Sequence, residues 1–119
     1  MGFDTSLWDN VLARRRAALE RERRALLDQI FRLLDEHGAR YGIRRAYIFG
    51  SVTKPGSFTE ASDVDIGVEG IDPERFCEAI GHFASLLGRE VDLIELQRCP
   101  FAHRIRERGI LWTGQPSSS

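Results

Sequence analysis

Two hydrophobic periods alternate along this chain and predict three strands and three helices. The segments 45–49, 64–68 and 90–96 are short and apolar, which is typical of buried strands. Between the second and third segments, apolar residues recur at helical spacing from residue 76 to residue 87. Asp72 stands before Pro73 as a helix N-cap, and Gly88 suits the C-terminal cap. A last helix is expected to open at Cys99-Pro100-Phe101 and to end near Gly109-Ile110-Leu111-Trp112.

The first third of the chain predicts one long helix, or two helices broken near Arg21. It has no glycine or proline from Leu7 to Glu36, and Ser6 is a candidate N-cap. A broad apolar face begins near Ala25 and should pack on the sheet. The first half of this segment is instead basic, with an apolar patch at its far end. That patch contains Leu7, Trp8, Val11 and Leu12.

This basic half has two interpretations. A solvated helix with charge pairs one turn apart is the simpler one and is favoured. The other is an arm that docks a partner protein or RNA, or through which the chain self-associates, because the patch is larger than a solvated helix requires.

The connections between the expected strands predict the topology of the sheet. A short connection joins the first two strands and favours antiparallel pairing. A strand–helix–strand unit follows, which normally makes a right-handed crossover between parallel strands. The fold class is therefore α/β (α+β), a small mixed β-sheet packed with helices. We expect a helical extension over 1–24, the domain over 25–112 and a disordered tail over 113–119.

Composition changes this picture little. The 119 residues are 42% hydrophobic and carry a formal net charge of −1, which fits one small domain and makes nucleic acid an unlikely partner. Cys77 and Cys99 do not suggest a disulfide framework or a zinc site, and Cys77 is expected in the core. No apolar run reaches membrane-spanning length and no signal peptide is evident, so a reducing cytoplasm is the expected compartment.

The candidate chemistry lies at the strand ends. Asp63 and Asp65 are two residues apart, so in a strand they point to the same face about 6.6 Å from each other. Asp92 opens the third strand, and Gly50-Ser51 ends the first. Three carboxylates on one edge repel each other unless a cation lies between them, and Mg²⁺ commonly shares its ligands with substrate phosphates. The simpler interpretation of each aspartate is a solvated strand end or a turn cap.

Gly67 lies on the same face as Asp63 and Asp65. It either leaves room for a nucleotide or marks a β-bulge, and the sequence does not decide between these two interpretations.

A Gly-Ser pair, a short loop, an Asp-x-Asp strand and a third aspartate on a neighbouring strand resemble the DNA polymerase β-like nucleotidyltransferase superfamily. The similarity covers roughly residues 25 to 112 and is strongest to the minimal nucleotidyltransferases, the antitoxin-like members often encoded beside a HEPN-domain partner. One departure is the loop, because eleven residues separate Ser51 from Asp63, one more than is usual in the family. Where the family commonly has Ala-Arg-Gly, this loop has Thr53-Lys54-Pro55-Gly56.

The resemblance implies a Mg²⁺-dependent nucleotidyltransferase that moves a nucleoside monophosphate, AMP from ATP, to a hydroxyl acceptor. It implies two magnesium ions held by Asp63, Asp65 and Asp92, which are also the catalytic residues. Gly50 and Ser51 would bind the phosphates, with Lys54 as a further contact. The acceptor would be a HEPN-type toxin partner. The alternatives are a non-catalytic, nucleotide-binding antitoxin subunit and a small-molecule transferase of the aminoglycoside type.

Overall fold

A computed structural model describes residues 5–114 of the chain. Most of the expected tail, residues 115–119, lies outside the described residues. The part of it that is described is ordered: Thr113 ends a strand, and the Gly114 amide donates to the Arg44 carbonyl at 2.9 Å.

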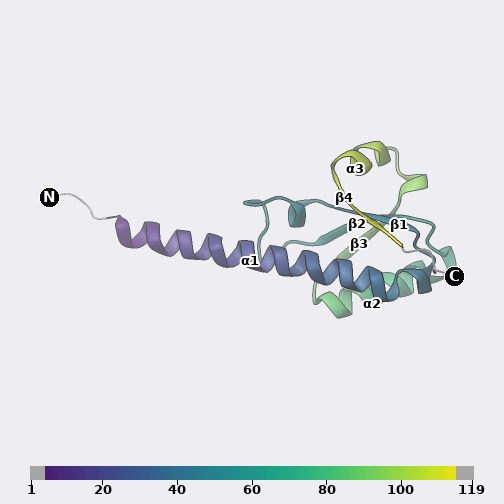
Figure 1. Cartoon of the computed structure of the whole chain (residues 1–119), viewed down its shortest axis with the longest axis horizontal. Coiled ribbons are helices and arrows are strands. Elements are labelled where there is room, and N and C mark those ends of the chain that lie inside the picture. The colour runs from purple at the N-terminus through teal and green to yellow at the C-terminus, as the bar shows by residue number, and fades with distance from the viewer. Residues whose placement is uncertain (1–4, 115–119) are drawn as a thin grey trace.

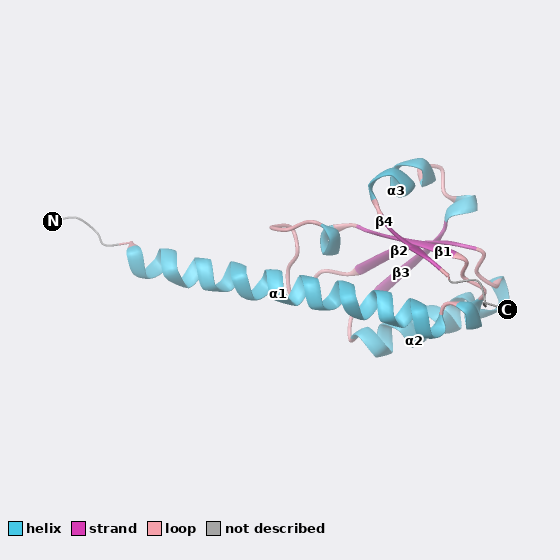
Figure 2. Cartoon of the chain, in the orientation of Figure 1, coloured by secondary structure: helices cyan, strands magenta, loops and turns pink. Residues whose placement is uncertain are grey.

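The centre of the fold is a four-stranded mixed sheet in the order β3-β2-β1-β4 (Figures 1 and 2). The strands are β1 (Arg45–Phe49), β2 (Val64–Glu69), β3 (Val91–Glu95) and β4 (Ile110–Thr113). β1 pairs antiparallel with β2, and β2 pairs parallel with β3. Both pairings match the expectation from the connections, and the α/β fold class is confirmed.

The fourth strand is a correction, because the sequence indicated a helix ending near residues 109–112 and no strand after it. Helix α3 (Ala102–Arg108) ends before Gly109, and the chain then pairs antiparallel with β1. Gly109 makes the close turn possible, because a Cβ there would lie 3.0 Å from the Tyr47 Cβ. Trp112 is buried, and its indole N–H donates to Asp35 at 2.8 Å.

Two helices, α1 (Ser6–His37) and α2 (Phe76–Leu87), cover one face of the sheet, and α3 lies on the other (Figure 1). The fully buried side chains between α1, α2 and the sheet include Ile30, Leu34, Ile48, Ile66 and Phe83. A smaller cluster packs under α3 and contains Tyr47, Leu96, Ala102 and Ile105.

The caps expected around α2 are present. The Asp72 side chain accepts from the Glu74 amide at 3.0 Å, in front of a short 3-10 turn that leads into the helix. Gly88 adopts the left-handed conformation at φ 65° and ends the helix. Cys77 is a further correction. It is exposed, because Ala79 and Phe83 are the α2 residues that bury into the core.

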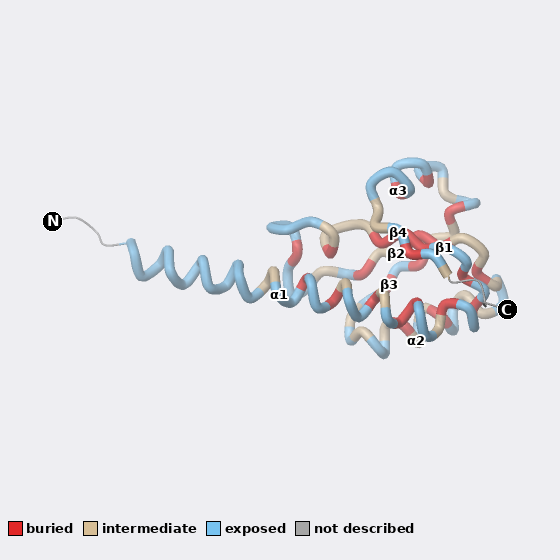
Figure 3. The backbone as a smooth tube through the Cα atoms, viewed as in Figure 1, coloured by how far each residue is buried: buried red, intermediate tan, exposed pale blue. Residues whose placement is uncertain are grey.

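Helix α1 is one unbroken helix rather than two. It begins at Ser6, with Thr5 in the N-cap position. Its 32 residues extend about 48 Å. The half that follows Leu19 packs on the sheet, whereas residues 5–18 are all exposed (Figure 3). Leu7 and Trp8 are 71% and 62% exposed, so the apolar patch has no partner within the described chain. We call residues 6–18 the arm.

Gly67 faces α3 and is neither a β-bulge nor an opening for a nucleotide. It pairs regularly with Tyr47 on β1 and with Ile94 on β3. A Cβ at this position would lie 2.7 Å from Leu96 Cδ2 and 3.1 Å from Ile105 Cγ2. The missing side chain therefore allows the small cluster under α3 to pack against the sheet.

Within residues 5–114, none of the helices combines the length and the apolar composition that crossing a bilayer requires.

Removing the arm should leave the domain folded, since residues 5–18 are all exposed. We expect deletion of residues 1–18 to change the free energy of unfolding by less than about 1 kcal/mol. Urea denaturation followed by circular dichroism measures this quantity. Light scattering of the same samples reports whether the arm mediates self-association. Loss of the cooperative transition would show that the arm belongs to the core.

Candidate active site

Pairing of the three central strands brings the predicted residues to one edge of the sheet. Asp65 is the register partner of Phe49 on β1 and of Asp92 on β3. Gly50 directly follows Phe49, so it lies beside Asp65. Val64 and Ile66 point to the opposite face and are fully buried in the core. The alternation of the strand therefore directs Asp65 away from the core while its neighbours anchor it.

The three carboxylates differ in exposure. Asp65 is half-buried, whereas Asp63 and Asp92 are exposed. Asp63 precedes β2 by one residue, and Asp92 is the second residue of β3. The edge thus presents one partly desolvated carboxylate between two that water reaches.

The pKa of Asp65 is raised to about 6 from its ordinary 3.8. Burial is the largest cause, and the negative charges of Asp92 and then Asp63 add to it. Both causes disfavour the ionised form. The charges of Asp92 and Asp63 therefore act on the carboxyl group of Asp65.

Gly50 is needed for the position of Asp65. Its backbone adopts φ 82° and ψ −160°, a conformation open essentially only to glycine. A Cβ built on Gly50 would collide with Asp65 Oδ2. The main chain of Gly50 and the carboxylate of Asp65 therefore lie in direct contact.

A tight turn carries the other predicted phosphate-binding residues. Ser51–Thr53 form a 3-10 turn in which the Thr53 hydroxyl donates to the Gly50 carbonyl at 2.7 Å. Val52 is fully buried and anchors the turn to the core. Ser51 is half-buried at the start of the turn, and Lys54 is exposed at its end. Gly50, Ser51 and Lys54 are thus on one short segment next to Asp65.

Arg23 supports this turn from α1, a role that sequence reasoning missed. Only 8% of Arg23 is exposed, and its Nη1 donates to the Val52 carbonyl at 3.2 Å. Glu20 pairs with the same guanidinium at 2.6 Å, which keeps the buried charge neutralised. In the sequence, Arg23 was one arginine of a basic run. The glutamate three residues before it fits a surface charge pair equally well.

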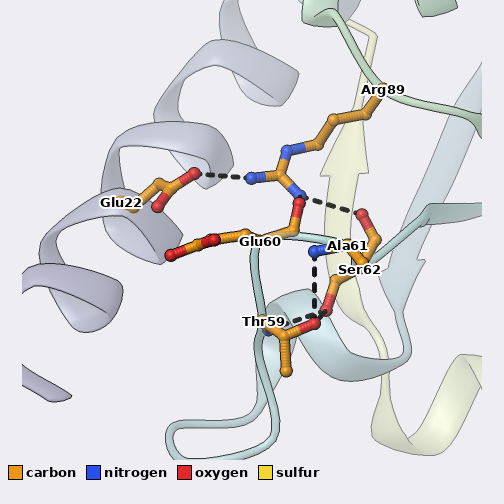
Figure 4. A network of polar contacts seen from close by, with 6 residues as sticks. All are labelled: Glu22, Thr59, Glu60, Ala61, Ser62 and Arg89. Atoms are coloured by element: carbon orange, nitrogen blue, oxygen red, sulfur yellow. Dashed lines mark hydrogen bonds and ion pairs between the residues drawn. The ribbon is translucent and has the colours of Figure 1, made fainter. Parts of the chain in front are cut away.

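Arg89 fixes the far end of the loop, immediately before Asp63 (Figure 4). Its Nη1 donates to the Ser62 carbonyl at 2.9 Å and to the Glu60 carbonyl at 3.1 Å. Its Nη2 donates to Glu22 on α1 at 2.7 Å, and its guanidinium lies 4.9 Å from the centre of the Phe58 ring. A turn in which the Ser62 hydroxyl accepts from the Thr59 amide at 2.9 Å completes the network. Nothing in the sequence pointed to Arg89, because both loop acceptors are main-chain oxygens.

The three carboxylates have the chemistry to bind a divalent cation, although their side chains are not close enough together to form a three-ligand site. Oxygen ligands are those that Mg²⁺ prefers. The raised pKa of Asp65 reflects burial first and then repulsion by Asp92 and Asp63, and a cation would relieve that repulsion. Across residues 5–114, no group of three or more acidic, histidine or cysteine side chains is close enough to hold a metal ion as it stands. A side-chain hydrogen bond with Asp92 is one of the causes of the raised Asp65 pKa, so those two carboxyl groups already face each other.

The chain belongs to the polymerase beta nucleotidyltransferase family, whose sequence pattern matches residues 29–115. The match spans β1 to β4 and therefore every residue of the carboxylate edge. A comparison with curated protein sequences gave no significant match.

Two solved structures are similar to the chain over most of its length. One is a toxin–antitoxin structure with AMP-PNP, with 25% identity and a TM-score of 0.57 over 74% of this chain and 73% of the other. The second is described as a minimal nucleotidyltransferase, also with 25% identity, and has a TM-score of 0.53 over 80% of this chain and 93% of the other. The resemblance inferred from the sequence is thereby confirmed.

Asp65 should make the metal-free protein less stable as the pH rises. Its folded pKa of about 6 lies above the ordinary 3.8, so the group favours folding fully below about pH 4. That contribution is lost as the pH rises through about 6. Asp65→Asn, which stays neutral, should therefore melt at a higher temperature than the parent at pH 8 and at nearly the same temperature at pH 4.

Calorimetric melts in EDTA at the two pH values measure this difference. Asp28→Asn is the matched control, since Asp28 is an exposed aspartate of α1 remote from the edge. An advantage of Asp65→Asn that is equal at pH 4 and pH 8 would contradict the raised pKa.

Arg89→Ala should loosen the loop before Asp63. We expect faster amide exchange at residues 59–63 and a loss of about 1–2 kcal/mol in unfolding free energy, because charge-assisted hydrogen bonds are removed. Hydrogen–deuterium exchange with mass spectrometry measures the first effect and urea denaturation the second. Arg32→Ala removes an exposed arginine of α1 and should change neither. Unchanged exchange at 59–63 in Arg89→Ala would show that the loop keeps its path without this side chain.

Proposed function

We propose that the chain transfers a nucleoside monophosphate, AMP from ATP, to a hydroxyl acceptor. The observation that carries this proposal is the pairing of Asp65 with Asp92 across two strands, in contact with Gly50, in a chain of the polymerase beta family. The AMP-PNP in the similar toxin–antitoxin structure supports adenosine triphosphate as the nucleotide.

Asp63, Asp65 and Asp92 are the residues that would hold two magnesium ions. When bound, these ions supply positive charge to the phosphates and lower the pKa of the attacking hydroxyl. The half-buried position of Asp65 between the other two makes it the natural shared ligand.

The remaining roles belong to the chain itself. The Gly50 main chain lets a phosphate approach closely, because no Cβ intervenes, and Ser51 and Lys54 offer a hydroxyl and an ammonium group. Asp92 is exposed on the side of Asp65 away from β1 and would accept the proton of the acceptor hydroxyl. The new bond joins the acceptor oxygen to the α-phosphorus, and the bond from that phosphorus to the bridging oxygen breaks. Pyrophosphate leaves with the electron pair.

The acceptor we propose is a hydroxyl side chain on a HEPN-type toxin partner, so that the chain acts as an antitoxin. The toxin–antitoxin structure similar to this chain supports such a partner. The arm offers a surface for docking. Its apolar patch is exposed, and Arg14, Arg15 and Arg16 lie next to it.

A second candidate is nucleotide binding without transfer, in an antitoxin that acts by docking alone. Two observations favour it: residues 5–114 contain no closed group of three candidate metal ligands, and Asp63 and Asp92 are exposed.

The experiment incubates the chain with a co-encoded HEPN protein, Mg²⁺ and ATP labelled at the α-phosphate. We expect label on the partner, no label in EDTA, and a loss of transfer of at least about 100-fold in Asp92→Ala, the scale of removing a general base. Asp28→Ala, the matched control, should label normally. If Asp92→Ala still inhibits the toxin without labelling it, docking alone neutralises the partner and the second candidate is correct.

A further inference from the structure

A cavity of about 270 Å³ opens beside Gly50, on the β1 side of the carboxylate edge. Phe49 and Gly50 line it from the end of β1, and Lys54 lines it from the turn. Phe101, Arg104 and Arg108 line it from α3 and the residue before that helix. Phe49 is the register partner of Asp65, and cross-strand partners share a face of the sheet, so the cavity and Asp65 are on the same face.

Three cations border this cavity without any acidic partner. Arg104 and Arg108 are one helical turn apart and therefore on one side of α3. Within residues 5–114, Lys54, Arg104 and Arg108 take part in no ion pair. Arg106, between the two arginines, shows the contrast, since it binds Glu69 at 2.9 Å. No acidic residue lines the cavity. Its chemistry suits an anion with several negative charges.

The strand order gives the cavity a direction relative to the carboxylates. In the sheet order β3-β2-β1-β4, Asp92 is on β3, Asp65 is on β2 and Gly50 follows β1. The cavity lies beyond Gly50, at the end of this row opposite to Asp92. A triphosphate with its α-phosphate at Asp65 and its chain passing Gly50 would bring its β- and γ-phosphates to the three cations.

The loop itself cannot supply these charges. From Ser51 to Asp63 it contains a single cation, Lys54. Arg104 and Arg108 come from a different element, about 50 residues further along the chain. Both arginines are exposed, so they are free to turn toward a phosphate in the cavity.

We propose that Arg104 and Arg108, together with Lys54, form the subsite for the diphosphate end of a nucleoside triphosphate. This inference deepens the proposed function and rests on its nucleotide. When the bond between the α-phosphorus and the bridging oxygen breaks, the electron pair goes to that oxygen of the leaving pyrophosphate. The two guanidinium groups neutralise the charge that develops there. The chain would thus distinguish a triphosphate from a monophosphate through α3.

The test measures binding of ATP, AMP and inorganic tripolyphosphate by calorimetry in Mg²⁺. We expect Arg104→Ala and Arg108→Ala each to weaken ATP and tripolyphosphate by about tenfold, the scale of one charge-assisted hydrogen bond. The affinity for AMP should stay within about twofold, because AMP lacks the groups that reach the cavity. Arg104→Gln and Arg108→Gln keep a polar side chain but remove its charge, and they should behave like the alanine variants. Arg32→Ala is the control and should match the parent for all three ligands.

Two outcomes would overturn the inference. Unchanged ATP affinity in a variant that combines Arg104→Ala with Arg108→Ala would show that the arginines do not touch the phosphates. An equal loss for AMP and ATP would show that the cavity holds the nucleoside instead. The proposed function fails separately. If the parent chain binds tripolyphosphate through Arg104 and Arg108 but transfers no AMP, the subsite stands and the proposed transfer is wrong. If the parent binds neither ATP nor tripolyphosphate, both proposals are wrong.

Discussion

The register of β2 is the constraint on which the site depends. This strand pairs antiparallel on one side and parallel on the other, and both pairings must agree for Asp65 to stand between Phe49 and Asp92. A slip of one residue would turn Asp65 into the core and expose Val64 and Ile66. Those two residues are fully buried, so the hydrophobic core enforces the register. Apolar packing on the opposite face of the sheet therefore holds the carboxylates close together in spite of their mutual repulsion.

The parts of this arrangement that could be predicted are those with local signals. Asp72 and Gly88 bracket α2 as expected. The Asp-x-Asp spacing predicted both aspartates on one face of a strand; Asp65 is in β2, and Asp63 lies one residue before it. The pairing directions followed from connection lengths. β4 was missed because its four residues follow a helix directly and carry no turn signal apart from Gly109. Gly67 was misread because its neighbours under α3, Leu96 and Ile105, are about 30 and 40 residues away in the sequence.

The supporting arginines were beyond sequence reasoning for a different reason. Arg23 and Arg89 contact residues 29 and 27 positions away, and these contacts exist only once α1 and the loop pack together. Sequence periodicity reports which face of an element is apolar, but it carries no information on which carbonyl a long polar side chain will reach. Arg23 was also hard to predict because a buried arginine is uncommon and because the charged segment around it resembles a solvated helix surface.

Both arginines that hold the loop donate hydrogen bonds to its main-chain carbonyls rather than to its side chains. Arg23 binds the Val52 carbonyl, and Arg89 binds those of Glu60 and Ser62. Every residue has such a carbonyl, so substitutions between these anchor points leave the clamps intact. Insertions and deletions do not, since they shift which carbonyl meets which guanidinium. The two clamps themselves therefore tolerate a change of side chain between Val52 and Glu60, whereas other contacts restrict single positions of that segment, since Phe58 is buried against the Arg89 guanidinium and Lys54 borders the cavity beside Gly50.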